Sequence, residues 1–233
     1  MSKDMLGPLT RALVGIDARR LPLMLDIANR MGGDQATAWE TRLKEVMREG
    51  LPKRQVAGFT RNEHGHVLIK VTGVDLSGAE EVGRLEATGC RVGNYAKSCF
   101  TSTNPDGYNL KHRLVTGQEY TVAIVLGTEV ERESDRTTEN LRKLGEKHGY
   151  QKPLAGIIPR IREAVSDEEM KAMNILYIAA LHDPIKDSDG YPSVLGAYRG
   201  VGGRFVLAGW DYPGYQWYDG GAFAFLVPAS PRV

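Results

Sequence analysis

The amino-acid sequence predicts an α+β protein, in which a helical N-terminal head precedes a mixed α+β body that ends in an antiparallel β meander. Two observations predict this order. Apolar residues recur at helical spacing through the first fifty residues, whereas short β-rich runs separated by turn residues fill the chain after residue 175. With 42% hydrophobic and 25% charged residues, the composition is that of an ordinary globular protein, so the chain is expected to fold.

Three helices are predicted in the head. Leu9, Leu13 and Ile16 recur at helical spacing, Pro22 suits the first turn of a second helix, and Asp34 is a suitable N-cap for a third. A segment without periodicity, residues 51–55, then combines proline with basic residues. It predicts a boundary between a helical region over residues 1–52 and an α+β body over residues 56–233.

The first part of the body is expected to alternate strands and helices. Ser77 is a plausible N-cap followed by acidic residues, and Gly89 suits the end of that helix. The expected strands are His66 to Val71 and Glu119 to Leu126, and the expected helices run from Ser77 to Gly89, from Asp135 to His148, and from Arg160 to Val165. Ser166 then resembles an N-cap followed by acidic residues.

The C-terminal part is expected to be an antiparallel meander, because turn signals separate its β-rich runs. Glycines at 200, 202 and 203 lead into a strand and not into a helix, so they predict a hairpin turn and not a phosphate-binding loop. The expected strands are Ile175 to Leu181, Ser193 to Tyr198, Arg204 to Leu207 and Ala222 to Val227.

This order of elements, with the stretch Asp-Ser-Asp-Gly-Tyr-Pro-Ser-Val and a late Trp/Tyr-rich segment before a Phe-x-Phe strand, resembles a group of uncharacterised bacterial proteins found in candidate-phyla genomes. The similar stretches are Leu76 to Ser98, Ile175 to Val194 and Phe205 to Val227, within the last two thirds of the chain. The resemblance implies no activity and no catalytic residues. It implies that the C-terminal part is one folding unit.

Charge and cysteine content restrict partners and location. Thirty basic and twenty-nine acidic residues give a net charge of +1, so no overall field attracts nucleic acid or membrane lipid. The N-terminal part is richer in basic residues, but acidic residues alternate with them, which favours a solvated helix face over a nucleic-acid-binding surface. Cys90 and Cys99 are expected to be free thiols. Without an evident signal peptide or membrane span, a cytoplasmic location is expected.

The most unusual composition lies in residues 210–219, where five aromatic residues with polar atoms stand among turn residues. Such side chains favour interfaces, although they also cover small sheets. The leading hypothesis is therefore a non-catalytic protein-binding module, whose binding residues are Trp210, Tyr212, Tyr215, Trp217 and Tyr218. Nucleic-acid binding through the basic N-terminal region is an alternative.

A second alternative is a hydrolase-like enzyme. Acid–base hydrolysis needs two well-placed carboxyl groups, and candidates surround the meander at Asp187, Asp189, Asp211 and Asp219. The stretch from Asp187 to Gly190 also resembles the start of a calcium loop. It lacks a third ligand and a downstream glutamate, so a hairpin turn is predicted instead.

His64 and His66 have a spacing that metals can use, because both would project from one face of a strand. The other histidines have no spacing relation to this pair. A turn that enters the strand at Gly65 is therefore predicted, with no metal and no cofactor.

Overall fold

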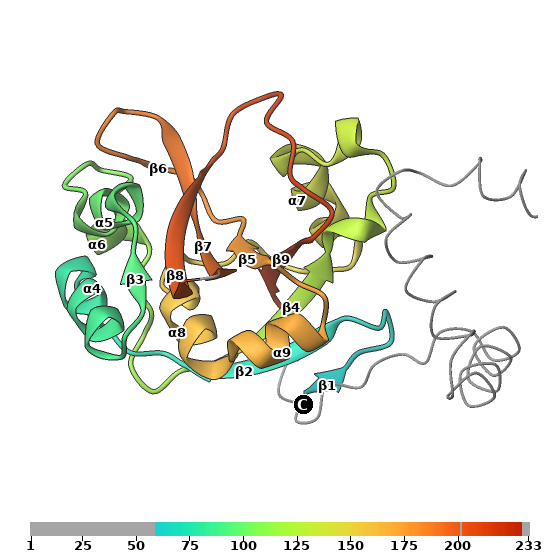
Figure 1. Ribbon diagram of the computed structural model, residues 1–233, viewed down its shortest axis with the longest axis horizontal. Helices are drawn as coiled ribbons and strands as arrows, with labels where there is room; N and C mark the ends of the chain where they lie inside the picture. Colours follow the sequence, from blue (N-terminus) through green and yellow to red (C-terminus); the bar gives the residue numbers. More distant parts are fainter. Residues whose placement is uncertain (1–58, 201, 230–233) are drawn as a thin grey trace, which may run out of the picture. The chain divides into compact units, whose positions relative to one another are not determined.

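The computed structural model describes residues 59–200 and 202–229 (Figure 1). They belong to the second of two units of the chain, Met1–Arg54 and Gln55–Val233, so the predicted helical head lies outside the described residues. The helices of the described part are α4 (Gly78–Ala87), α5 (Asn94–Thr101), α6 (Tyr108–Lys111), η3 (Gly127–Glu129), η4 (Glu133–Asp135), α7 (Thr138–Lys147), α8 (Ile157–Ala164) and α9 (Asp167–Ala172). The strands are β1 (Thr60–Arg61), β2 (Val67–Thr72), β3 (Arg91–Val92), β4 (Glu119–Leu126), β5 (Tyr177–Ala180), β6 (Ile185–Lys186), β7 (Pro192–Gly200), β8 (Gly203–Trp210) and β9 (Gly221–Leu226).

These strands form one nine-stranded mixed sheet. Its order is β1-β2-β4-β9-β5-β7-β8-β3, and β6 pairs with β7 outside this path. Neighbours are antiparallel except for β3 with β8 and β5 with β9, which run parallel. The prediction of a mixed α+β body is confirmed.

Local sequence signals explain several element boundaries. The Ser77 hydroxyl accepts a hydrogen bond from the Glu80 amide, and the Glu80 carboxylate accepts one from the Ser77 amide, which is a complete capping box at the start of α4. Gly89 follows that helix with a φ of +75°, a backbone conformation that glycine adopts at little cost. The predicted strand from Glu119 to Leu126 is β4, with the same bounds.

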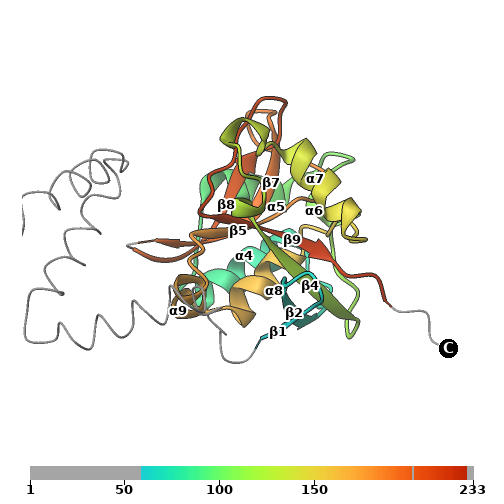
Figure 2. The ribbon, with the colours of Figure 1, turned by 90° about the vertical axis from the view of Figure 1, so that its right-hand side faces the viewer.

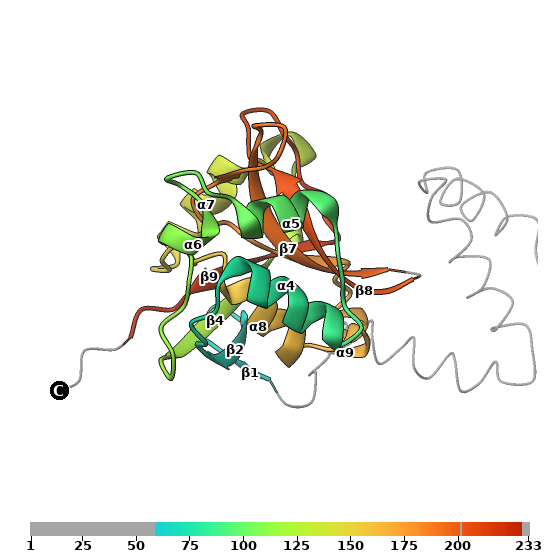
Figure 3. The same cartoon turned by 90° about the vertical axis from the view of Figure 1, so that its left-hand side faces the viewer.

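Both faces of the sheet are covered. On one face, α5 packs on β7 and β8, while α8 contacts β2 and β7 (Figure 3). On the other face lies α7 (Figure 2), where Gly145 lies so close to Phe225 that an added Cβ would be 2.5 Å from its ring. Alternation along β9 follows from this arrangement: Ala222 and Ala224 face the first layer, and Phe223 and Phe225 face the second.

The predicted meander is only partly correct. β5, β7 and β8 are consecutive antiparallel neighbours, and Gly200 pairs with Gly203 at the predicted hairpin turn. The last strand, however, does not continue the meander: β9 returns across the sheet and lies between β4 and β5, parallel to β5. The physical reason is burial, because Gly221 to Phe225 are all buried, and such a strand needs neighbours on both edges and cover on both faces.

Candidate functional site

Of the five predicted binding residues, Trp217 is buried in the core and does not reach the surface. Its side chain is 2% exposed, and its ring lies 5.6 Å from Phe223 and 5.7 Å from Tyr177, between centroids. The indole Nε1 donates a hydrogen bond of 2.9 Å to the Thr138 hydroxyl at the start of α7. The prediction that Trp217 contacts a partner is therefore wrong, because a large ring with one polar atom is satisfied inside this layer of the core.

Three other rings of the segment form a cluster at the end of β8. The ring centroids of Trp210 and Tyr212 are 5.9 Å apart, and Tyr215 lies 6.0 Å from Trp210 and 5.9 Å from Tyr212. Tyr215 in turn meets the buried Trp217 edge to face at 5.1 Å. The outer rings, Trp210 at 46% and Tyr212 at 41% exposure, are thus supported from below by the core.

Two further exposed tyrosines extend this surface, and sequence reasoning missed them. Trp210 pairs with Ser193 at the start of β7, which places Tyr191, 55% exposed, beside the end of β8. Tyr95 on α5, 49% exposed, donates a 2.9 Å hydrogen bond to Asp189 in the neighbouring turn. We call this surface the aromatic rim, and define it as Tyr95, Tyr191, Trp210 and Tyr212.

Tyr218 is not part of the aromatic rim. It is the most exposed of the five predicted binding residues, at 67%, and its carbonyl accepts a hydrogen bond from Tyr177 at the start of β5. The rim lies instead beyond the C-terminal end of β5. There Arg142 of α7 donates a hydrogen bond to the Leu181 carbonyl and forms an ion pair of 2.7 Å with Asp211. That ion pair ties the residue between Trp210 and Tyr212 to α7.

The aspartates predicted as a carboxylate site come together only in part: Asp187 and Asp189 share one turn, whereas Asp219 lies apart from them. Asp187 is buried and accepts hydrogen bonds from the amides of Asp189 and Tyr191, so it holds the predicted turn. Asp211 is paired with Arg142. Asp219 lies beside the first residue of β5, whereas Asp211 lies beyond its last, and a strand of this length spans roughly 13 Å.

The predicted turn at His64 and His66 is present. Asn62 accepts hydrogen bonds from the amides of both histidines, and Gly65 between them has a φ of +84°. His148, which carried no spacing relation to the pair, comes beside it: its ring centroid is 4.6 Å from His64 and 4.7 Å from His66. The sequence contains no signal for this approach, because it depends on how α7 ends over the sheet.

Both cysteines are buried and unpaired, as predicted, and burial raises the pKa of the Cys99 thiol to about 12. Neither is poised as a nucleophile, because a thiol needs a lowered pKa to react readily. Over residues 59–200 and 202–229, no helix is both long enough and apolar enough to cross a bilayer. In comparisons with known proteins, the chain matches no family model, no curated protein and no solved structure.

Proposed function

We propose that this chain is a non-catalytic protein-binding module that contacts its partner through the aromatic rim. One observation carries the proposal: four of the eight large hydrophobic side chains that are exposed in the described part of the chain gather at one end of the β7–β8 hairpin. Exposed aromatic residues that cluster on a firm support are typical of interface hot spots, since they bury a large area and lose little side-chain entropy on binding.

Contacts with α7 and with the core hold the aromatic rim in place, which favours binding of a partner without a change in the conformation of the rim. Trp210 and Tyr212 flank Asp211, which Arg142 holds, and Tyr215 rests on the buried Trp217. A pre-organised surface keeps more of its contact energy as affinity, because less ordering is needed on binding.

The charges beside the rim favour a protein over a nucleic acid. Asp189 accepts a hydrogen bond from Tyr95 within the rim, and the Arg142 guanidinium is neutralised by Asp211. A phosphate backbone would need unpaired cations at this place. Nucleic-acid binding through the basic N-terminal region depends on residues outside the described ones and stays a prediction, as do the bacterial origin and the cytoplasmic location.

The proposal is tested by capture of partners on the full chain, after nuclease treatment of the lysate, with wild type, a rim variant and a surface control. The rim variant is Tyr191→Ala with Trp210→Ala, and the control is Leu110→Ala, since Leu110 is 72% exposed and lies on α6. We expect one protein that wild type and control retain and that the rim variant binds about 30-fold more weakly or worse, which corresponds to ~2 kcal/mol. Equal retention by all three would refute the proposal.

A further inference from the structure

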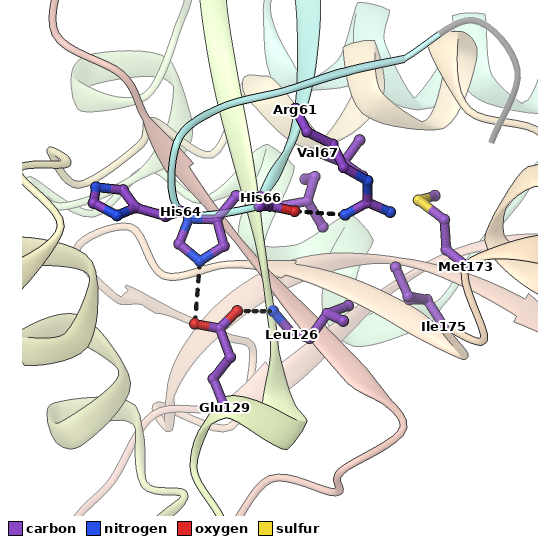
Figure 4. Close-up of a pocket in the computed structure, with 10 residues that line it drawn as sticks. Arg61, His64, His66, Val67, Leu126, Glu129, Met173 and Ile175 are labelled. Atoms are coloured by element: carbon purple, nitrogen blue, oxygen red, sulfur yellow. Dashed lines mark hydrogen bonds and ion pairs between the residues drawn. The ribbon is translucent and has the colours of Figure 1, made fainter. Parts of the chain in front are cut away.

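Three of the five histidines of the chain lie close together: the neighbours His64 and His66, and His148, which is distant from them in the sequence. His66 ends the turn before β2, and His148 is the C-cap residue of α7. Glu129 ends η3, directly after β4, and reaches them because the start of β2 lies beside the end of β4. Figure 4 shows the Glu129 carboxylate facing the His66 ring, with His64 beside it.

The three ligating atoms have the separations of a metal's coordination shell. His66 Nε2 lies 3.1 Å from Glu129 Oε2, His148 Nε2 lies 3.8 Å from the same oxygen, and one ligand atom of each residue lies within 4.8 Å of the others. Nitrogen and oxygen ligands at ~2.0–2.1 Å from a tetrahedral zinc ion are about 3.3 Å apart. Small side-chain rotations therefore suffice to bring all three onto one ion.

The residues behind His66 are those that a ligating imidazole needs. Its Nδ1 lies 2.6 Å from the Tyr150 hydroxyl oxygen, and Asn62 also donates to that oxygen. With the proton on Nδ1, the ring donates to Tyr150 and leaves the Nε2 lone pair free toward Glu129 and His148. Histidine ligands of metals are ordinarily fixed in this way by a partner at the second nitrogen.

Space for an ion and a further ligand adjoins these groups. A pocket of about 70 Å³ is lined by His64, His66, Glu129 and Arg61, together with apolar side chains. His148 does not line this pocket, which adjoins the cluster on the side of His66 and Glu129; a single water needs only ~10–15 Å³, so the pocket can hold a water beside these two residues. The remaining histidines offer no comparable site: His182 is buried with both ring nitrogens hydrogen-bonded to the backbone, and the His112 ring nitrogen accepts from a backbone amide.

We propose that His66, Glu129 and His148 bind one divalent transition-metal ion. Zn²⁺ is the ion that we expect, with His64 or water as the fourth ligand. Two imidazoles and one carboxylate are a borderline-soft set that suits zinc and iron(II), whereas calcium and magnesium prefer oxygen ligands throughout. The bound ion links the start of β2, the end of β4 and the end of α7, so it also stabilises the second layer of the core.

The test uses the full chain after removal of metal with a chelator, and Zn²⁺ alone as the probe, in competition with a chromogenic chelator. We expect one zinc per chain with micromolar or tighter affinity, and a higher melting temperature with zinc than without it. Glu129→Gln and His148→Gln should each weaken zinc binding by more than 100-fold, which exceeds the roughly 10–100-fold loss expected for Tyr150→Phe through its effect on His66.

Glu146→Gln is the matched control, because Glu146 is an exposed carboxylate on α7 near His148. It should bind zinc as wild type does. Circular dichroism without metal reports whether each variant folds; the Glu129 side chain is 31% exposed and that of His148 is 18% exposed, so the Glu129 variant is the less disruptive of the two. The proposal is overturned if folded wild type binds no stoichiometric zinc, or if Glu129→Gln and His148→Gln both bind zinc as tightly as Glu146→Gln. The cluster would then be a hydrogen-bonded network only.

Discussion

Replacement of Trp217 by alanine separates a core role from a surface role most directly. The indole is 2% exposed and contacts Tyr177, Tyr215 and Phe223. Truncation of a buried tryptophan costs about 3–5 kcal/mol, since the transferred apolar area is lost and a cavity remains. The substitution also removes the donor to the buried Thr138 hydroxyl, which adds about 1 kcal/mol.

Guanidinium or urea titration of the full chain, followed by circular dichroism, measures this loss. At a slope of about 2 kcal/mol per molar urea, a loss of 4 kcal/mol moves the unfolding midpoint of this unit down by roughly 2 M with little change in slope. Trp217→Phe keeps most of the ring and should cost much less than alanine, because only the hydrogen bond and a smaller volume are lost.

Tyr218→Ala is the matched control. Its side chain is adjacent in sequence but 67% exposed, so the free energy of unfolding should change by no more than about 0.5 kcal/mol. If Trp217→Ala proves as mild as Tyr218→Ala, the assignment of Trp217 to the core is wrong, and the ring is again a candidate contact for a partner.

Two further predictions concern backbone packing and pH. Gly145→Ala and Gly83→Ala both replace a helical glycine, but a Cβ at Gly145 would meet the Phe225 ring, whereas Gly83 is exposed with no atom within 4 Å of the added carbon. We expect Gly83→Ala to stabilise the protein by about 0.5–1 kcal/mol and Gly145→Ala to destabilise it by about 1–3 kcal/mol, as thermal melts of both would reveal; the same sign for both would contradict this packing. Burial lowers the pKa of His182 to about 3. Between about pH 3 and the ordinary histidine pKa of about 6.5, this imidazole therefore binds a proton in the unfolded chain but not in the folded chain. Stability from this group is complete above pH ~6.5 and falls as the pH drops toward 3, by up to ~1.4 kcal/mol per pH unit. Urea titrations at pH 7 and pH 5 should differ more for wild type than for His182→Gln, and an equal difference would contradict a buried neutral imidazole.

Much of the local structure was predictable from the sequence, because its causes lie within a few residues. Ser77 and Glu80 form their capping box inside one helical turn. Gly65, Gly89 and Gly203 adopt the positive φ values at turns or at a helix end that such signals indicate. The apolar run of β4 likewise required a buried strand wherever its neighbours lay.

The candidate sites depended instead on contacts between distant residues. The composition of residues 210–219 indicated an aromatic surface, but it could not distinguish the exposed Trp210 from the buried Trp217, since both are tryptophans among turn residues. Tyr191 joins the rim only through the register between β7 and β8.

The placement of β9 illustrates the same limit within the fold. Its apolar sequence determined that both of its faces would be buried, but it carried no information on which strands would be its neighbours. His148 likewise stands 82 residues after His66, and only the docking of α7 over the sheet brings their rings to 4.7 Å. Helix caps, turns and hydrophobic periodicity can thus be predicted from the sequence, because they depend on residues close together in the chain. The order of the strands and the approach of distant side chains such as His66 and His148 depend on how the whole domain packs.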